Sequence, residues 1–281
     1  MEAHLEEKYG TLVEIIKSIG KACIAYSGGV DSSLLVKVCA DTLDTKKILA
    51  VTGVSEIFTP SEAFIAGELA RSMGVRCTTL KTAEMKDHDF LKNDGDRCYH
   101  CRSGFYRDLV LVARAHGFAV IIDGSNLDDR EDYRPGRRAA EEFGIRSPLL
   151  DAGMGKEDVR ALSRELGVPG WDRPANPCLA SRIPYGTPIT KERLDAVEKS
   201  EEFIRSLGFK EVRVRHHDDI ARIEIPIPDM ARFLEKGCRE LVEHFIKGLG
   251  FKWVSLDLGG YRMGSLNSVL PAEGGGAVMA K

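Results

Sequence analysis

Residues 27–33 read Ser-Gly-Gly-Val-Asp-Ser-Ser and stand between a short apolar run and a helix-like run. Gly28 and Gly29 let the backbone take a positive φ and approach a bound anion closely, which residues with a Cβ resist. Ser32 and Ser33 open the helix-like run, where hydroxyl donors and the positive end of the helix dipole favour phosphate oxygens. A strand, a glycine loop and a helix in this order predict an α/β fold whose loop binds a pyrophosphate group.

The loop is not a Walker A motif, because no Gly-Lys-Ser or Gly-Lys-Thr follows a four-residue gap. It resembles instead the PP-loop of enzymes that split ATP into AMP and pyrophosphate and thereby adenylylate an oxygen of their substrate. The simpler alternative is a Gly-Gly turn with a serine at the helix N-cap. The surrounding strand, loop and helix pattern favours the phosphate-binding interpretation.

The first half of the chain alternates short β-rich runs with amphipathic helical segments. We expect strands at 22–26, 47–53, 75–80, 119–123 and 146–149. We expect helices at about 32–43, 61–73, 99–116, 135–143 and 156–166. This alternation predicts a doubly wound parallel sheet covered on both faces, with its ligand beyond the carboxyl ends of the strands.

A second strand end carries polar groups that could face the same nucleotide. Asp123 and Ser125 follow the strand predicted at 119–123, and in a parallel sheet they would share an edge with residues 27–33. An ordinary turn after a strand explains these two residues equally well when they are taken alone.

The pattern changes after Gly167, where closely spaced prolines prevent a helix from continuing. Beyond them we expect helices near 190–207 and 229–248 and strands near 211–216, 220–225 and 251–258. The predicted organisation is a nucleotide domain over residues 1–185 and a smaller α+β domain over 186–270 that binds substrate or mediates oligomerisation. Residues 271–281, which contain three consecutive glycines, are expected to lack fixed structure.

Composition limits the partners and the compartment. With 281 residues, of which 43% are hydrophobic, the chain can bury one large core or two. A net charge of -3 gives no general attraction to nucleic acid, so long polyanions are disfavoured partners. No apolar stretch approaches the roughly 20 residues that cross a bilayer, and the first residues lack the order of a signal peptide. We therefore predict a cytoplasmic protein with no membrane partner.

In a reducing compartment, seven cysteines argue for metal binding, sulfur chemistry or buried thiols rather than for disulfides. Cys98 and Cys101 form a C-x-x-C pair at the start of a predicted helix, close enough for both sulfurs to bind one metal centre. Cys178 lies in the proline-rich loop, which can fold back over the nucleotide edge. Three such thiolates can hold a [4Fe-4S] cluster with one iron open to an outside ligand. The alternatives are a zinc site completed by His100, a redox pair, and no special role.

The other four cysteines fall on apolar faces of predicted strands and helices. They are expected to be small core residues: Cys23, Cys39, Cys77 and Cys238.

A third candidate group is cationic. Alternation along a strand places Arg213 and Arg215 on one face with His217, where two guanidinium forks can grip a phosphate or a carboxylate. Arg222 could extend the cluster from the next strand, and Arg262 follows the last strand. The alternative is a strand face that is simply solvated.

Taken together, these motifs and their order make the chain resemble the LarE family over about residues 8–270. Beside the loop and the C-x-x-C pair, the motifs are Asp-Gly-Ser-Asn-Leu-Asp-Asp, Asp-Tyr-Arg-Pro-Gly-Arg at 132–137, Pro-Cys-Leu-Ala-Ser-Arg-Ile-Pro-Tyr-Gly, Arg-Val-Arg-His and Gly-Tyr-Arg-Met-Gly-Ser. The loop alone indicates only a broad superfamily, and the Pro-Cys-Leu-Ala-Ser-Arg segment is much more specific than the loop. Members of this family are sulfur transferases in the synthesis of the nickel-pincer nucleotide cofactor of lactate racemase. They adenylylate the carboxylates of pyridinium-3,5-biscarboxylic acid mononucleotide and convert them to thiocarboxylates.

The resemblance implies roles for particular residues. Cys178 matches the cysteine that some members consume as their sulfur source, becoming dehydroalanine. Cys98 and Cys101 match a variant in which three cysteines bind a [4Fe-4S] cluster that carries an extra sulfide, so we favour a catalytic cluster over a sacrificial cysteine. Arg213, Arg215 and Arg262 would bind the phosphate of the mononucleotide. The ATP phosphates and Mg²⁺, with Asp31 near the metal, would be held by Ser27, Gly28, Gly29, Asp31, Ser32 and Ser33.

The resemblance also implies a homo-oligomer, often a hexamer, and a sulfide source outside the chain. Three other functions remain open alternatives. A tRNA thiolase of the PP-loop type would share the cysteines, but no recognised RNA-binding module is present. An amidating ligase would need an ammonia source, and no glutaminase constellation is evident. A non-catalytic nucleotide or zinc sensor would keep the loop without forming AMP.

Overall fold

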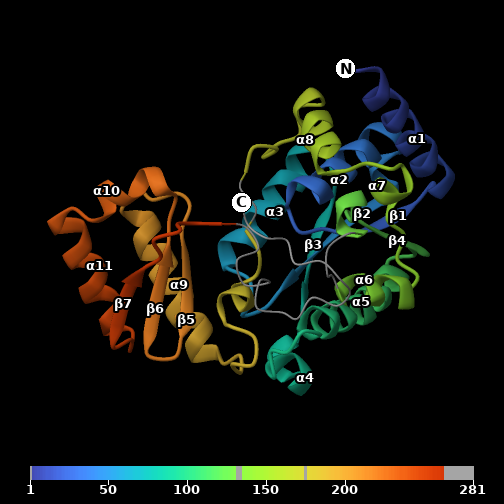
Figure 1. Ribbon diagram of the computed structural model, residues 1–281. Coiled ribbons are helices and arrows are strands. Elements are labelled where there is room, and N and C mark those ends of the chain that lie inside the picture. The colour runs from blue at the N-terminus through green and yellow to red at the C-terminus, as the bar shows by residue number, and fades with distance from the viewer. Residues whose placement is uncertain (1, 131–134, 174–175, 263–281) are drawn as a thin grey trace, which may run out of the picture. The chain divides into compact units, whose positions relative to one another are not determined.

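The computed structural model describes residues 2–130, 135–173 and 176–262, which form two compact units (Figure 1). The first unit comprises Met1–Leu91 and Asp96–Cys178, and the second comprises Lys92–Gly95 and the chain from Leu179 onward. Residues 179–185, which the sequence-based division assigns to the first domain, therefore group with the second unit. The predicted tail at 271–281 and the motif residues 132–134 and 263–265 lie outside the described residues.

The described part of the first unit contains a parallel sheet with the strand order β3-β2-β1-β4. Its strands are β1 (Ala22–Ala25), β2 (Ile48–Val54), β3 (Cys77–Lys81) and β4 (Val120–Asp123). Ala25, the last residue of β1, lies opposite Val51 on β2 and Asp123 on β4. The loop after β1 and the loop after β4 therefore leave the sheet at the same edge, as the sequence predicts.

Helices cover both faces of this sheet, so the predicted doubly wound α/β fold is confirmed. One apolar cluster joins the sheet to α1 (Ala3–Ile19), α2 (Val30–Thr42), α3 (Pro60–Ser72) and α8 (Lys156–Glu165). The other joins it to α5 (Arg97–Ala115) and α6 (Pro135–Glu142), which pack side by side in Figure 1. Successive side chains of β1 pack into different apolar clusters: Cys23 belongs to the cluster with α5, and Ile24 belongs to the cluster with α2. This alternation explains why β1 is apolar throughout.

One predicted strand and the beginning of the chain differ from expectation. Residues 146–149 do not form a strand: Arg146 makes an isolated parallel bridge to Ile122, and a helical turn, α7 (Pro148–Asp151), follows. Pro148 explains the difference, because its ring removes the backbone donor that a strand ladder needs and suits the first turn of a helix. The helix α1 was not predicted. Its apolar residues Leu5, Leu12 and Ile16 recur at helical spacing and are buried.

The second unit is an α+β structure, as predicted. Its sheet has the order β5-β6-β7, with β5 and β6 antiparallel and β6 and β7 parallel. The region predicted as one helix at 229–248 is broken at Leu234 and Glu235 into two helices. The elements are α9 (Lys191–Ser206), β5 (Arg213–His217), β6 (Ile220–Glu224), α10 (Met230–Phe233), α11 (Lys236–Gly248) and β7 (Trp253–Leu256).

Short elements complete the described chain. These are the helix α4 (His88–Leu91) and the 3-10 turns η1 (Thr45–Lys47), η2 (Glu84–Lys86), η3 (Leu127–Arg130), η4 (Leu179–Arg182) and η5 (Ile227–Asp229). Within the described ranges, no helix combines the length and the apolar character that crossing a membrane requires.

Candidate active site

The glycine loop after β1 is shaped by close packing. Gly28 has a φ of 74°, and a Cβ added to it would lie 2.9 Å from the Cβ of Ala66 on α3. Both the backbone conformation and the lack of space therefore require glycine at this position. Gly29 is the N-cap of α2, with φ −74° and ψ 162°, so the loop leads directly into the helix N-terminus. This is the geometry in which backbone N–H groups and the helix dipole favour an anion.

The serines of the loop form a hydrogen-bonded group. The Ser27 N–H donates to Ser32 Oγ at 3.3 Å, and Ser32 Oγ donates to the Gly29 carbonyl at 3.0 Å. The Gly29 N–H donates to Ser27 Oγ at 3.3 Å. Ser33 Oγ lies 3.2 Å from the Tyr26 hydroxyl in the core. The predicted loop residues thus come together at one end of β1, and their hydroxyls already define the shape of the loop.

The chain that follows β4 lies directly against this loop. A Cβ added to Gly124 would be 2.8 Å from the backbone nitrogen of Ser32, so only glycine permits the approach. Asn126 Nδ2 donates to Asp31 Oδ1 at 3.1 Å, and Lys156 of α8 forms an ion pair with Asp31. Lys156 is not among the predicted site residues, because no local motif surrounds it. Only the packing of α8 beside α2 brings it to the loop.

Asp123, which was predicted to face the nucleotide, is 2% exposed and serves the architecture of the loop. Its carboxylate accepts from Ser125 N at 3.1 Å, Ser125 Oγ at 2.9 Å, Ser147 Oγ at 2.7 Å and the Tyr106 hydroxyl at 2.9 Å. Arg102 Nη1 lies 3.6 Å away. Asp123 and Ser125 are therefore hydrogen-bonded to each other. That either residue binds the nucleotide stays a prediction.

The C-x-x-C pair lies in the first turns of α5, as the sequence predicts. Cys98 is exposed, whereas Cys101 lies beside Glu84 of η2, with 3.8 Å between Cys101 Sγ and Glu84 Oε1. Glu84 is 5% exposed, and its other carboxylate oxygen has no hydrogen-bond partner in the described chain. Burial raises the pKa of the Cys101 thiol well above its ordinary value, and the charges of Glu84, Cys178 and Cys98 raise it further.

Cys98 and Cys178 are thus among the charges that raise the pKa of the Cys101 thiol. Among the described residues, however, no group of three or more His, Cys, Asp or Glu side chains is arranged as a metal site. Of the cysteines expected in the core, Cys23 and Cys39 are buried, and burial raises the pKa of each thiol to about 12. The other two, Cys77 and Cys238, are only partly buried.

The loop that carries Cys178 is fastened to α3 on its N-terminal side. Glu62 accepts from Asn176 Nδ2 at 3.0 Å and forms an ion pair of 3.4 Å with Arg173 Nη2. No motif near Glu62 indicates this role, which depends on a contact between distant segments.

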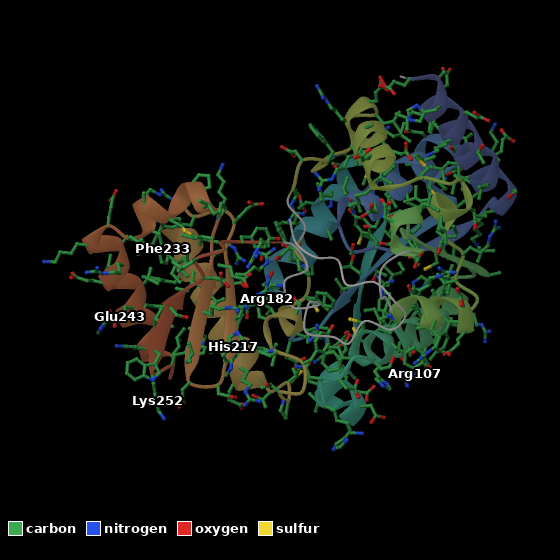
Figure 2. The ribbon with its side chains drawn as sticks, viewed as in Figure 1. Arg107, Arg182, His217, Phe233, Glu243 and Lys252 are labelled. Carbon is green, nitrogen blue, oxygen red and sulfur yellow. The ribbon has the colours of Figure 1, made fainter. Side chains whose placement is uncertain are left out.

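The second unit contains buried arginines that are matched by carboxylates. Arg182, labelled in Figure 2, is fully buried and donates to both oxygens of Glu201 on α9, at 2.9 and 3.0 Å. Glu201 also accepts from Arg205 Nη2 at 2.6 Å and from the Val214 N–H at 3.1 Å. Burial raises the pKa of Glu201, but Arg182 and the neighbouring arginines outweigh it, so the pKa lies below its ordinary value.

The two strand arginines predicted to bind phosphate differ in their surroundings. Arg215 donates to both oxygens of Glu224, at 3.0 and 2.8 Å, so its fork already meets a carboxylate. Arg213 donates to the Val212 carbonyl at 2.7 Å, and its guanidinium lies 5.2 Å from the centre of the Tyr261 ring. Burial lowers the pKa of Arg213, and the positive charge of Arg182 lowers it further.

The other predicted members of the cationic cluster lie around the same strands. His217, also labelled in Figure 2, has a pKa below its ordinary value because it is partly buried and lies near Arg222 and Arg215. Arg262 folds back onto its own turn, since a Cβ added to Gly259 would lie 2.9 Å from the Arg262 Cζ.

A parallel sheet of order 3-2-1-4, with a serine-glycine loop that leads from its first strand into a helix, is the α/β fold expected of a PP-loop enzyme. Over 95% of its length, the chain is 40% identical to the pyridinium-3,5-bisthiocarboxylic acid mononucleotide synthase of Lactiplantibacillus plantarum, of which it covers 96%. It is 43% identical, over 95% of its length and 99% of the relative, to an uncharacterized protein of Synechocystis. The chain belongs to the LarE family and is an enzyme of the sulfurtransferase class.

A more distant similarity extends beyond this family. The tRNA-specific 2-thiouridylase MnmA of Azorhizobium caulinodans is 26% identical over 63% of the chain and 55% of the relative. No protein-family model matches the chain.

Proposed function

We propose that the chain uses ATP to adenylylate the carboxylates of pyridinium-3,5-biscarboxylic acid mononucleotide and then converts them to thiocarboxylates. The observation that carries the proposal is the presence, in one unit, of a glycine loop that leads into a helix N-terminus and of three cysteines, two of which, Cys98 and Cys178, raise the pKa of the third. The near full-length similarity to a bisthiocarboxylic acid mononucleotide synthase supplies the substrate class.

The first step activates a carboxylate, which otherwise resists nucleophiles because attack would add charge to an anion and expel oxide. A carboxylate oxygen attacks the α-phosphorus of ATP, the bond between the α- and β-phosphates breaks, and pyrophosphate leaves. Backbone N–H groups of residues 27–33 and the N-terminus of α2 would bind the departing pyrophosphate. Asp31, already held by Asn126 and Lys156, would carry Mg²⁺ on its carboxylate, with the hydroxyls of Ser32 and Ser33 nearby.

The second step delivers sulfur. A sulfide nucleophile attacks the carbonyl carbon of the acyl-adenylate, the bond to the AMP oxygen breaks, and AMP leaves with both electrons of that bond. The proposal includes Cys98, Cys101 and Cys178 as the ligands of a [4Fe-4S] cluster. Their soft thiol sulfurs fit such a group, which when bound would offer a soft site for sulfide. The alternative within the same function is a sacrificial Cys178.

In the second unit, Arg213 with Arg215 and Arg262 would bind the phosphate of the mononucleotide. We further propose that sulfide comes from outside the chain and that the protein is a homo-oligomer, a hexamer by the family resemblance. Light scattering coupled to gel filtration measures that state directly.

The decisive experiment incubates anaerobically reconstituted protein with ATP, Mg²⁺ and sulfide, together with either the pyridinium mononucleotide or bulk tRNA. AMP and the product mass are measured. More than one transferred sulfur per chain on the mononucleotide supports the catalytic form of the proposal, whereas a yield that stops near one supports the sacrificial cysteine. AMP that forms with tRNA alone overturns the assignment in favour of a tRNA thiolase, the function that the similarity to MnmA raises.

A cysteine variant tests whether Cys178 acts only in sulfur delivery and not in adenylylation. We expect Cys178→Ala to abolish thiocarboxylate formation while leaving AMP formation partly intact, because the glycine loop is unchanged. Cys238→Ala, in the second unit and only partly buried, is the matched control and should leave both measurements at the wild-type level. If Cys178→Ala removes both activities together, Cys178 does more than deliver sulfur.

A further inference from the structure

Asn93 is fully buried in Lys92–Gly95, a short segment that groups with the second unit although the chain on both sides belongs to the first. Its backbone carbonyl accepts from the Gly186 N–H at 2.9 Å. Its side-chain amide nitrogen donates to three backbone carbonyl oxygens, those of Ile183 at 3.3 Å, Pro184 at 2.8 Å and Thr187 at 2.8 Å. One side chain therefore ties the segment before α5 to the segment after η4.

The backbone at this position also suits asparagine. Asn93 has a φ of 58°, a left-handed conformation that asparagine adopts more readily than most residues with a Cβ. Asp218, in the turn between β5 and β6, is the other non-glycine residue with a positive φ in the described ranges. Both the left-handed backbone conformation and the amide group that donates to three carbonyls therefore favour asparagine at position 93.

The two segments joined by Asn93 lead directly to the thiols. Cys98 follows Asn93 by five residues, and Cys178 precedes Ile183 by five residues. On the other side of Cys178, Glu62 fastens Asn176 to α3. Because Cys178 is distant in sequence from the C-x-x-C pair, contacts such as these must set how close the thiols come.

We propose that Asn93 is a positioning residue that holds Cys178 within reach of Cys98 and Cys101. The assignment rests on the proposed function only in giving these thiols a role in sulfur transfer. Without the amide, the carbonyls of Ile183, Pro184 and Thr187 lose the hydrogen bonds that Asn93 donates, and the two segments are held together less tightly. The effective concentration of Cys178 at the pair then falls, although each cysteine keeps its own local structure.

The test measures thiol proximity in the metal-free full-length protein, without ATP or substrate. Dibromobimane bridges two nearby thiols, and peptide mass spectrometry identifies which cysteines are joined. We expect Asn93→Gly, which keeps the backbone conformation accessible, to lower bridging of Cys178 to the pair by about tenfold or more, as expected for the loss of one or two buried hydrogen bonds. Bridging between Cys98 and Cys101, which lie within one turn of α5, should not change.

The matched control is Asp218→Gly, which removes a polar side chain from the other left-handed position and should bridge like the wild type. Undiminished bridging of Cys178 in Asn93→Gly would overturn the proposal. If circular dichroism shows that Asn93→Gly is unfolded, Asn93→Asp is measured in the same way, because its carboxylate repels the three carbonyls. Reduced bridging of Cys178 in Asn93→Asp would then support the proposal, and undiminished bridging would overturn it.

The assay also separates this inference from the proposed function. Lost bridging in a protein that never thiolates the mononucleotide would uphold the role of Asn93 and reject the proposed function. In an active enzyme, Asn93→Gly should slow thiocarboxylate formation and leave the KM for ATP in AMP formation unchanged, a split that general destabilisation would not produce.

Discussion

Gly124→Ala is a direct test of how the nucleotide loop is built. The added Cβ would lie 2.8 Å from Ser32 N, 3.0 Å from Ser32 Cα and 3.1 Å from the carbonyl carbon of Asp31. Favourable contacts of this kind lie at about 3.5–4.0 Å, so the two backbones must separate by about 0.5–1 Å. Neither neighbour is the flexible end of a side chain. We therefore expect the variant to lose about 1–3 kcal/mol of unfolding free energy, the usual cost of overpacking.

The same displacement should also lower activity. The first turn of α2 carries the groups proposed to bind phosphate, and a shift of about 1 Å in a reacting group can cost about 100-fold in rate. Urea unfolding monitored by circular dichroism measures the first effect, and AMP formation measures the second.

Gly10→Ala on α1 is the control, because its Cβ would meet nothing within 4 Å and alanine favours a helix. It should match or slightly exceed wild-type stability. Wild-type stability together with wild-type AMP formation in Gly124→Ala would refute the close approach of the β4 loop to α2.

Two further predictions concern buried charges. Glu84→Gln removes a negative charge beside Cys101 and so lowers the pKa of that thiol. Iodoacetamide should then alkylate Cys101 faster in the metal-free protein, with the alkylation rate of Cys98 as the reference. An unchanged rate for Cys101 would contradict this. Because the pKa of Glu201 is below its ordinary 4.5, its pairing with Arg182 stabilises the fold above that value and fades as the pH falls through the lowered one. Glu201→Gln should cost about 3–5 kcal/mol in urea unfolding at neutral pH, and less in acid; a cost independent of pH would count against it.

Local patterns were sufficient to predict the core of the first unit. An apolar run followed by the glycine loop predicts β1 and α2, because the conformation of such a segment depends mostly on its own residues. The strand predicted at 146–149 was wrong because its apolar character comes from burial of Leu149 in a helical turn. Helix and strand cannot be separated by hydrophobicity in so short a run.

Contacts between distant segments could not be predicted in the same way. Lys156 reaches Asp31, and Asn93 reaches the carbonyls around Pro184, across more than 90 residues of sequence in each case. Nothing in the residues around Lys156 or Asn93 distinguishes them from ordinary surface or turn positions. Their roles depend on which elements pack together, and this is a property of the whole fold.

The arginines of the second unit show how the structure sharpens a pattern that the sequence leaves open. Alternation along β5 predicts only that Arg213 and Arg215 share a face, whereas the structure shows that Glu224 occupies the fork of Arg215. Around Glu201, by contrast, the positive charges of Arg182, Arg205 and Arg213 all act on one carboxylate.

Burying several guanidinium groups around one carboxylate is costly, because each charge loses hydration that one partner cannot replace. The depressed pKa of Arg213 has burial as its main cause and repulsion from Arg182 as its second. An anion bound beside Arg213 would relieve that repulsion but would share Arg213 with Glu201, and an anion at Arg215 would have to compete with Glu224. The two arginines would therefore contribute to binding of the proposed phosphate in different ways: binding would offset repulsion between cations at Arg213 and would displace a carboxylate at Arg215.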